Sequence, residues 1–257
     1  MDNMIEVKGL KKSYGSTEVL NIEELSIPKG QSFGLVGNNG AGKTTFFRLI
    51  LDLIKPSGGE VLSKGSTVML SEHWKGYTGA FLDEGFLIDY LTPEEYFDFI
   101  AKLYGLEVST LKEKLAFFDQ LFNGEILGKK KYIRDLSKGN QKKVGIVGAL
   151  LGDPEILVLD EPFANLDPST QYLLRDILKK LDAETEMTML ISSHDLIHVT
   201  EFCQRIVILD HGKAIKDIRT SAETLKELEQ FFIREVKEGH ENGTPTEVPD
   251  QVQGAND

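Results

Sequence analysis

A glycine-rich loop between a strand pattern and a helix pattern constrains the fold of this chain more than any other feature. The loop occupies residues 37–44 (GNNGAGKT) and matches the spacing G-x-x-x-x-G-K-[ST]. Residues 32–36 (SFGLV) are typical of a short buried strand, and residues 45–54 (TFFRLILDLI) are typical of an apolar helix. A strand, such a loop and a helix in this order predict an α/β core that binds a nucleotide at the loop.

The loop offers several ligands for phosphate. Its glycines leave backbone N–H groups free to face phosphate oxygens, and the start of the following helix adds a positive dipole end. Lys43 adds a full charge, and the Thr44 hydroxyl is a ligand for Mg²⁺. The alternative is a junction that carries glycines without binding phosphate. We predict that the following residues bind the phosphates of a nucleotide: Gly37, Asn38, Asn39, Gly40, Ala41, Gly42, Lys43, Thr44 and Thr45.

Composition narrows the possible partners and compartment. The formal net charge of −12 argues against nucleic acid as a partner, because its phosphates are bound by clustered Lys and Arg. Cys203 is the only cysteine, so no disulfide can form within the chain and we expect a reducing compartment. The sequence has neither a signal-peptide pattern nor a run of ~18 apolar residues. We therefore expect a cytoplasmic protein that reaches a membrane only through a partner.

The rest of the chain alternates strand-like and helix-like segments, which predicts the α/β class. Residues 4–8 and 18–27 alternate apolar and polar side chains, as half-exposed strands do. From residue 92 to 122 the periodicity is helical, so we expect a helical insertion at about 90–150. Other expected segments are strands at 60–72, 155–160, 187–192 and 205–209, helices at 138–151, 168–182, 195–202 and 221–237, and a hairpin at 209–215.

An acidic tail follows the predicted domain, which covers residues 1–237. Residues 238–257 contain five acidic residues and no Lys, Arg or aromatic residue. Such a segment cannot bury enough apolar surface to offset its chain entropy, so we predict that it is disordered.

Two carboxylates end the most continuously apolar strand candidate. Residues 155–160 (EILVLD) lack alternation, which predicts a strand buried on both faces of a parallel sheet. Ligands bind at the carboxyl edge of such sheets, so Asp160 and Glu161 would face phosphates held by residues 37–44. Asp160 could then hold Mg²⁺, and Glu161 could orient the attacking water or accept its proton. The alternative is a strand that ends in two solvated acids.

Four further motifs resemble those of the ATP-binding cassette (ABC) ATPases, and the resemblance covers about residues 4–236. Residues 136–141 (LSKGNQ) are similar to the family's signature motif and contain its Ser137 and Gly139. Residues 165–167 (NLD) resemble the D-loop, and His194 in ISSHD matches the switch histidine. Tyr14 matches the aromatic residue that stacks on adenine, with packing of its ring against protein as the alternative.

The resemblance implies a fold, a mechanism and a dimer. The fold would be a P-loop NTPase core of the ABC type with an N-terminal antiparallel β-subdomain and an inserted α-helical subdomain. Two cassettes would sandwich two ATP molecules head to tail, so that Ser137 and Gly139 of one contact ATP on the other. Glu161, His194 and Lys43 would be catalytic, with ATP and Mg²⁺ as cofactors. A homodimer is favoured over a heterodimer, which stays open.

Two departures from the family pattern affect the site. Asp83 stands where the family usually has Gln, with Glu84 as the alternative assignment, and a carboxylate there could still meet Mg²⁺. An acid at this position resembles the branch that exports drugs, lipids or peptides. Lys138 and Asn140 replace the commonest signature residues, while Gly139 is kept.

Aromatic residues between 77 and 122 suggest a partner surface. Most should fill the core of the helical subdomain, but a short insertion cannot hide all of them. Exposed rings beside Asp83, such as Phe86 and Tyr90, would form a groove for a helix of a membrane partner, with Trp74 and Tyr77 at its rim.

The sequence thus favours the ATP-hydrolysing subunit of a membrane transporter. It would power export through a separate transmembrane permease and lie peripherally on the cytoplasmic face of the membrane. Two alternatives remain: a soluble cassette ATPase acting on ribosomes or DNA, and a regulatory cassette that binds ATP but scarcely hydrolyses it.

Overall fold

The computed structural model of the chain describes residues 2–230. Contacts divide the chain into two units, Met1–Ser221 and Ala222–Asp257, and the fold below is that of the first. The tail predicted at 238–257 lies outside the described residues, as do residues 231–237 of the helix predicted at 221–237. In the described part of that helix, residues 224–230 are helical. Among the residues that are described, no helix is both long and apolar enough to cross a membrane.

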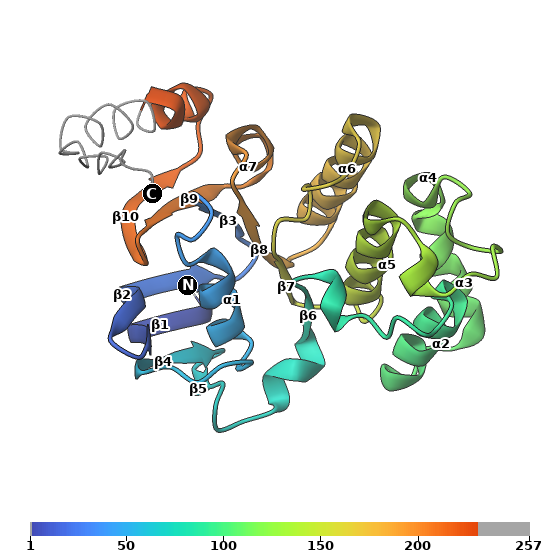
Figure 1. The fold of residues 1–257 in the computed structure, drawn as a ribbon, viewed down its shortest axis with the longest axis horizontal. Helices are drawn as coiled ribbons and strands as arrows, with labels where there is room; N and C mark the ends of the chain where they lie inside the picture. The colour runs from blue at the N-terminus through green and yellow to red at the C-terminus, as the bar shows by residue number, and fades with distance from the viewer. Residues whose placement is uncertain (1, 231–257) are drawn as a thin grey trace, which may run out of the picture. The chain divides into compact units, whose positions relative to one another are not determined.

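A six-stranded sheet forms the centre of the first unit (Figure 1). Its order is β10-β9-β3-β8-β7-β6, parallel except for the antiparallel pair of β9 and β10. All residues of β3, β7 and β8 are buried, as their continuous apolar runs predict. The strands are β3 (Ser32–Val36), β6 (Thr78–Phe81), β7 (Ile156–Leu159), β8 (Thr188–Ser193), β9 (Arg205–Asp210) and β10 (Lys213–Arg219).

The edge strand β6 is a finding that the sequence patterns did not provide. Its four residues (TGAF) are too few to show a period, and they include a glycine. Gly79 is required there, because a Cβ at this position would lie 2.0 Å from the carbonyl oxygen of Ala149. The strand pairs in parallel with β7 and thereby places the segment that begins at Leu82 beside the end of β7.

A second sheet of four antiparallel strands forms the N-terminal subdomain. Its order is β2-β1-β4-β5, built from β1 (Asn3–Tyr14), β2 (Thr17–Pro28), β4 (Gly58–Ser63) and β5 (Ser66–Thr67). Helix α1 (Lys43–Ile50) joins both sheets in one hydrophobic core, in which Phe46 and Phe47 are fully buried. The helix begins two residues before its predicted start and ends four residues before its predicted end at 54.

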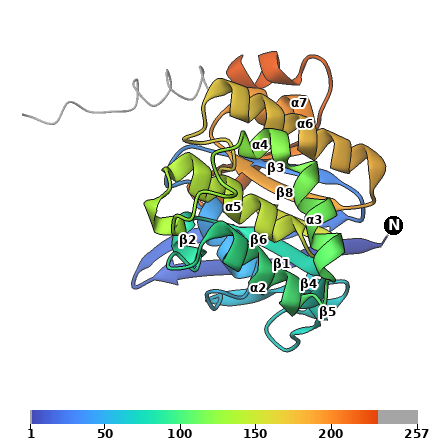
Figure 2. The same cartoon turned by 90° about the vertical axis from the view of Figure 1, so that its right-hand side faces the viewer.

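Four helices of the inserted segment lie together on one side of the sheets (Figures 1 and 2). They are α2 (Pro93–Leu103), α3 (Val108–Phe117), α4 (Asp119–Phe122) and α5 (Lys138–Leu150). Thr92 and Glu95 form a capping box that starts α2. The rings of Phe97, Phe118 and Phe122 pack against one another inside this group. The expected α/β fold, with its β-subdomain and inserted helices, is confirmed.

The remaining helices complete the unit. They are α6 (Pro168–Glu184), α7 (Leu196–Phe202) and the 3₁₀ turns η1 (His73–Tyr77), η2 (Glu84–Phe86) and η3 (Ile133–Asp135). Cys203 follows α7 and is buried against β3, where a Cβ added at Gly34 would lie 3.1 Å from its sulfur. Burial raises the pKa of the Cys203 thiol far above its ordinary value.

Candidate active site

The loop between β3 and α1 has the geometry of a phosphate-binding loop. Gly40 and Gly42 have φ angles of 85° and 106°, in the left-handed region that favours glycine. At Gly37 a Cβ would lie 2.3 Å from the carbonyl oxygen of Leu209, so this position also requires glycine. No side chain caps the start of α1, which leaves its first N–H groups available to an anion.

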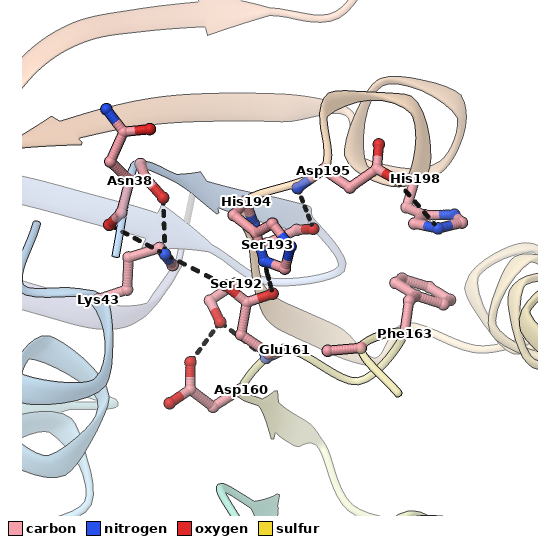
Figure 3. Close-up of polar contacts among 12 residues, drawn as sticks. Asn38, Lys43, Asp160, Glu161, Phe163, Ser192, Ser193, His194, Asp195 and His198 are labelled. Atoms are coloured by element: carbon pink, nitrogen blue, oxygen red, sulfur yellow. Dashed lines mark hydrogen bonds and ion pairs between the residues drawn. The ribbon is translucent and has the colours of Figure 1, made fainter. Parts of the chain in front are cut away.

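A cavity of about 250 Å³ opens over this loop, and Lys43 lies at its base. The Lys43 ammonium donates hydrogen bonds to the carbonyl oxygens of Gly37 (2.6 Å) and Asn38 (3.4 Å) (Figure 3). The cavity is lined by Val19, Asn38, Asn39, Gly40, Gly42, Lys43, Thr44, Thr45 and Glu161. Most of the predicted phosphate ligands and one predicted catalytic carboxylate therefore share one space.

Asp160 follows β7 and forms a buried cluster with two hydroxyls. The Thr44 hydroxyl donates to its Oδ2 at 2.5 Å, and the Ser192 hydroxyl donates to its Oδ1. Burial raises the pKa of Asp160, while these two hydrogen bonds act in the opposite direction. A hydroxyl and a carboxylate are the hard oxygen ligands that Mg²⁺ prefers, so the pair fits that ion.

Glu161 is held by its backbone as well as by its side chain. Its φ of 47° is unusual for a residue other than glycine. The amide of Glu161 donates to the Ser192 hydroxyl at 2.9 Å, and its carbonyl accepts a hydrogen bond from the Lys142 ammonium at 2.8 Å. This conformation points the carboxylate toward the glycine-rich loop.

The three residues predicted to be catalytic meet at the Glu161 carboxylate (Figure 3). Its Oε1 lies 3.1 Å from the Lys43 ammonium, and its Oε2 lies 2.8 Å from His194 Nδ1. The backbone amide of His194 also donates to Oε2, at 3.3 Å. A base positioned between a cation and an imidazole, beside a phosphate-binding loop, suits the activation of water next to a phosphate.

The signature residues lie in a different hollow. Ser137 caps α5 by accepting a hydrogen bond from the Asn140 amide at 3.2 Å. The hollow has a volume of about 310 Å³ and is lined by Gly124, Glu125, Lys129, Lys131, Asp135, Leu136, Ser137 and Asn140. These lining residues are separate from those around Lys43. Gly139 lies against the loop that follows Glu161, since a Cβ there would be 3.3 Å from the carbonyl oxygen of Asn165.

Tyr14 and Asp83 have contacts other than those of the cluster around Glu161. Tyr14 is exposed at the end of β1 with the Lys12 ammonium 4.7 Å from the ring centroid, so its ring does not pack in the core. Asp83 accepts a hydrogen bond from the Gly85 amide at 2.7 Å and lies 3.8 Å from the Arg48 guanidinium. Roles of Tyr14 in stacking on adenine and of Asp83 in metal binding stay predictions.

The prediction that Trp74 lies at the rim of the aromatic groove is wrong. Its side chain is only 8% exposed, and its indole donates a hydrogen bond to the Val68 carbonyl at 3.1 Å. Tyr77 is half-buried, with its hydroxyl 3.0 Å from that of Ser63. Both residues belong to the junction with the N-terminal sheet, because the 3₁₀ turn that carries them folds back onto the core.

Two residues of the site were missed by sequence reasoning. Ser192 bonds both Asp160 and the Glu161 amide, and a hydroxyl in a fully buried strand could have signalled a polar partner. Lys142 lies on the buried face of α5 and reaches the carbonyl oxygens of Glu161 and Ala164. A lysine among the apolar residues of a helix likewise indicates a polar partner, although the sequence does not identify that partner.

Comparison with known proteins identifies the family. Residues 20–164 match the family described as ABC transporter. The chain belongs to this family. The ABC transporter ATP-binding protein YhaQ of Bacillus subtilis (strain 168), itself uncharacterized, is 34% identical over 229 residues, which cover 89% of this chain and 74% of YhaQ. The bacitracin transport ATP-binding protein BcrA of Enterococcus faecalis is 33% identical over 226 residues, 86% of this chain and 71% of BcrA.

A solved structure agrees with this assignment. The dimeric structure of MJ0796, a bacterial ABC transporter cassette, is 26% identical and superposes with a TM-score of 0.74, covering 85% of this chain and 100% of the other. Some curated relatives are longer, and the alignments cover 57% of one and 77% of another. This ABC cassette is therefore an ATP-binding subunit of an ABC transporter, and its enzymatic activity is ATP hydrolysis.

Proposed function

We propose that two copies of this cassette bind two Mg²⁺-ATP molecules between them and power export through a separate transmembrane permease. The observation that carries the catalytic part is the Glu161 carboxylate, held between Lys43 and His194 at the edge of the phosphate-binding loop. The resemblance of Asp83 to the exporter branch supports export, and the relative named for bacitracin transport supports a role in transport.

The catalytic step follows from the charges around Glu161. When ATP binds, the Lys43 ammonium leaves the Glu161 carboxylate and contacts the β- and γ-phosphates of ATP. The Glu161 carboxylate can then accept a proton from the attacking water. His194 would turn its N–H from the carboxylate to the γ-phosphate, because a neutral imidazole has a single N–H to donate. Thr44 and Asp160 would hold the Mg²⁺, which neutralises charge on the phosphate oxygens.

The dimer is proposed because one chain supplies half of each composite site. The phosphate-binding loop and the signature hollow have separate linings, so Ser137 and Gly139 would serve ATP on the other copy. The start of α5 offers free N–H groups to that phosphate. The dimeric state of the related cassette supports this arrangement, and a homodimer needs no further chain.

The permease would dock at the aromatic groove next to Asp83. Phe86 and Tyr90 are 53% and 64% exposed, which is unusual for rings of this size. A helix of the permease could bury both rings in the helix-in-groove mode. This contact would hold the cassette at the cytoplasmic face of the membrane.

Two measurements test the proposal. Glu161→Gln should retain ATP binding but lose hydrolysis by about 100-fold or more, because it lacks the base. In membranes that contain the transporter, the wild-type chain should copurify with a multi-span protein, and Phe86→Ser with Tyr90→Ser should release it. Unchanged turnover in Glu161→Gln would contradict the catalytic part, and unchanged copurification of the groove variant would contradict the docking site.

A further inference from the structure

We infer that Lys142 is a positioning residue for ATP hydrolysis: its ammonium fixes the loop 161–164 and so aims the Glu161 carboxylate. The inference rests on the proposed role of Glu161 as the base. It concerns a side chain that touches neither the phosphate-binding loop nor the signature hollow.

The contacts of Lys142 are with the backbone of the catalytic loop. Its Nζ donates hydrogen bonds to the carbonyl oxygens of Glu161 and Ala164, both at 2.8 Å. The amide of Ala164 donates to the same Glu161 carbonyl at 3.2 Å and closes a turn. The ammonium therefore bridges the first and last residues of this turn.

The conformation of Glu161 explains why such a bridge is needed. A φ of 47° is unfavourable for a residue with a Cβ, so the surrounding structure must hold it. The Ser192 hydroxyl fixes the Glu161 amide from β8, and Lys142 fixes its carbonyl from α5. Without Lys142, the Glu161 carbonyl keeps only the 3.2 Å hydrogen bond from the Ala164 amide, so the peptide after Glu161 is held less firmly.

The burial of Lys142 shows that its contact with the two carbonyl oxygens is part of the packed interior. The residue is only 5% exposed, although lysine is almost never found inside a protein unless it is paired. Burial lowers the pKa of Lys142, and the nearby carboxylates of Glu84, Glu161 and Asp160 raise it. A buried charge with two carbonyl partners holds them more firmly than a neutral donor would.

The neighbouring residue on α5 extends the connection. The Gln141 amide donates to the carbonyl oxygens of Ile133, Arg134 and Leu136, in the segment that leads to Ser137. Two adjacent buried side chains thus tie α5 to the signature segment on one side and to the Glu161 loop on the other.

The test compares Lys142→Met with Lys143→Met in the full chain with Mg²⁺-ATP. Methionine keeps the length of the side chain but removes the donors. Lys143 is equally buried on the same helix, and in the part of the chain that the structure describes no hydrogen bond joins its ammonium to residues 161–164. We expect kcat to fall by about 10- to 100-fold in Lys142→Met, with the Kd for ATP within about twofold of wild type. Lys143→Met should keep kcat.

A double variant distinguishes positioning from general destabilisation. If Lys142 acts through Glu161, adding Lys142→Met to Glu161→Gln should leave the residual rate unchanged. Lys142→Arg, which keeps a charged donor, should recover part of kcat. If Lys142→Met does not fold, Lys142→Gln takes its place in both comparisons.

Three results would overturn the inference. They are a folded Lys142 variant with wild-type kcat, a further loss of rate in the Glu161→Gln background, and equal losses of kcat and ATP affinity in every Lys142 variant. Failure of the proposed function is a separate result, because Glu161→Gln alone would then hydrolyse ATP at the wild-type rate.

Discussion

At the scale of single residues, the site is organised around one carboxylate and the groups that hold it. Lys43 contacts the Glu161 side chain and the carbonyl oxygens of its own loop, so it is neutralised before a ligand arrives. An incoming triphosphate offers the ammonium a stronger partner than the carbonyls do. The affinity for ATP therefore depends on how well Lys43 can exchange these contacts.

We expect Lys43→Ala to weaken ATP binding by about 10- to 100-fold, the value of one charged hydrogen bond to phosphate. The melting temperature should change little, because the loop conformation is set by its glycines. Isothermal titration of ATP measures the affinity, and Lys112→Ala, at an exposed lysine of α3 away from the loop, is the control. An unchanged Kd would remove Lys43 from the binding site.

The candidate site could be predicted only as far as local motifs reach. The glycine-rich loop, the two acids after a buried strand and the switch histidine are short patterns, and the structure brings Lys43, Glu161 and His194 together. Lys142 could not be found this way, because its partners lie 19 and 22 residues further along the chain. Contacts of this kind depend on how a helix packs, which no local pattern encodes.

At the scale of elements, α5 packs closely because glycines on its surface face aromatic rings. A Cβ at Gly145 would lie 2.1 Å from the Phe81 ring, and one at Gly148 would lie 2.8 Å from the Tyr96 ring. These contacts seat α5 against β6 and α2. They therefore also fix the position of the N-terminus of α5, and with it Ser137, relative to the sheet.

We expect Gly145→Ala to lower the free energy of unfolding by about 1–2 kcal/mol, although alanine favours a helix. The reason is that the buried Phe81 ring cannot move aside. Urea unfolding measures the change. Combined with Phe81→Leu, which removes the obstructing ring, the substitution should cost less than the sum of the two single variants. Strict additivity would show that the ring is not the obstacle.

Tyr96 in α2 gives this packing a dependence on pH. Burial raises its pKa to about 12 from an ordinary value of 10.0, so the folded protein keeps the phenol proton longer than the unfolded chain does. Since the folded state binds more protons in this window, stability falls as the pH rises from 10 to 12. The loss for this group amounts to about 2–3 kcal/mol. Between pH 10 and pH 12, Tyr96→Phe should lose correspondingly less stability than the wild type. Tyr90→Phe, at an exposed ring, should lose as much as the wild type, and urea titrations at both pH values measure the difference.

The elements themselves could be predicted where apolar runs are long. The buried strands β7 and β8 and the helix α6 lie close to their expected bounds. The end of α1 was predicted too late. Asp52 adopts a φ of 49° and Pro56 follows, but the apolar residues Leu51, Leu53 and Ile54 continue the helical pattern past this point. The strand β6 was missed because its identity depends on pairing with β7 rather than on its own residues.

At the scale of the whole molecule, the proposed mechanism requires a second copy of the cassette. Its phosphate-binding loop and its signature hollow cannot both serve one ATP molecule within a single chain under the proposed arrangement. In a head-to-tail dimer each composite site takes its loop from one copy and its signature from the other. This geometry leads to a mixing experiment.

Lys43→Ala and Ser137→Glu should each be inactive alone, because every composite site then contains a defect. An equal mixture should regain roughly a quarter of the wild-type rate, since half of the dimers are mixed and each mixed dimer has one intact site. Phosphate release measures the recovery. Glutamate is tolerated at a helix start, so Ser137→Glu should fold. No recovery after exchange of subunits would contradict a symmetric homodimer.

The shielded position of Cys203 has a practical consequence for such experiments. The chain carries no other thiol, and this one lies behind β3 out of reach of a maleimide. The native protein can thus serve as its own cysteine-free background. A single cysteine introduced on the surface would carry a spin label or fluorophore alone, so that the approach of two copies could be followed as a distance in an otherwise unaltered molecule.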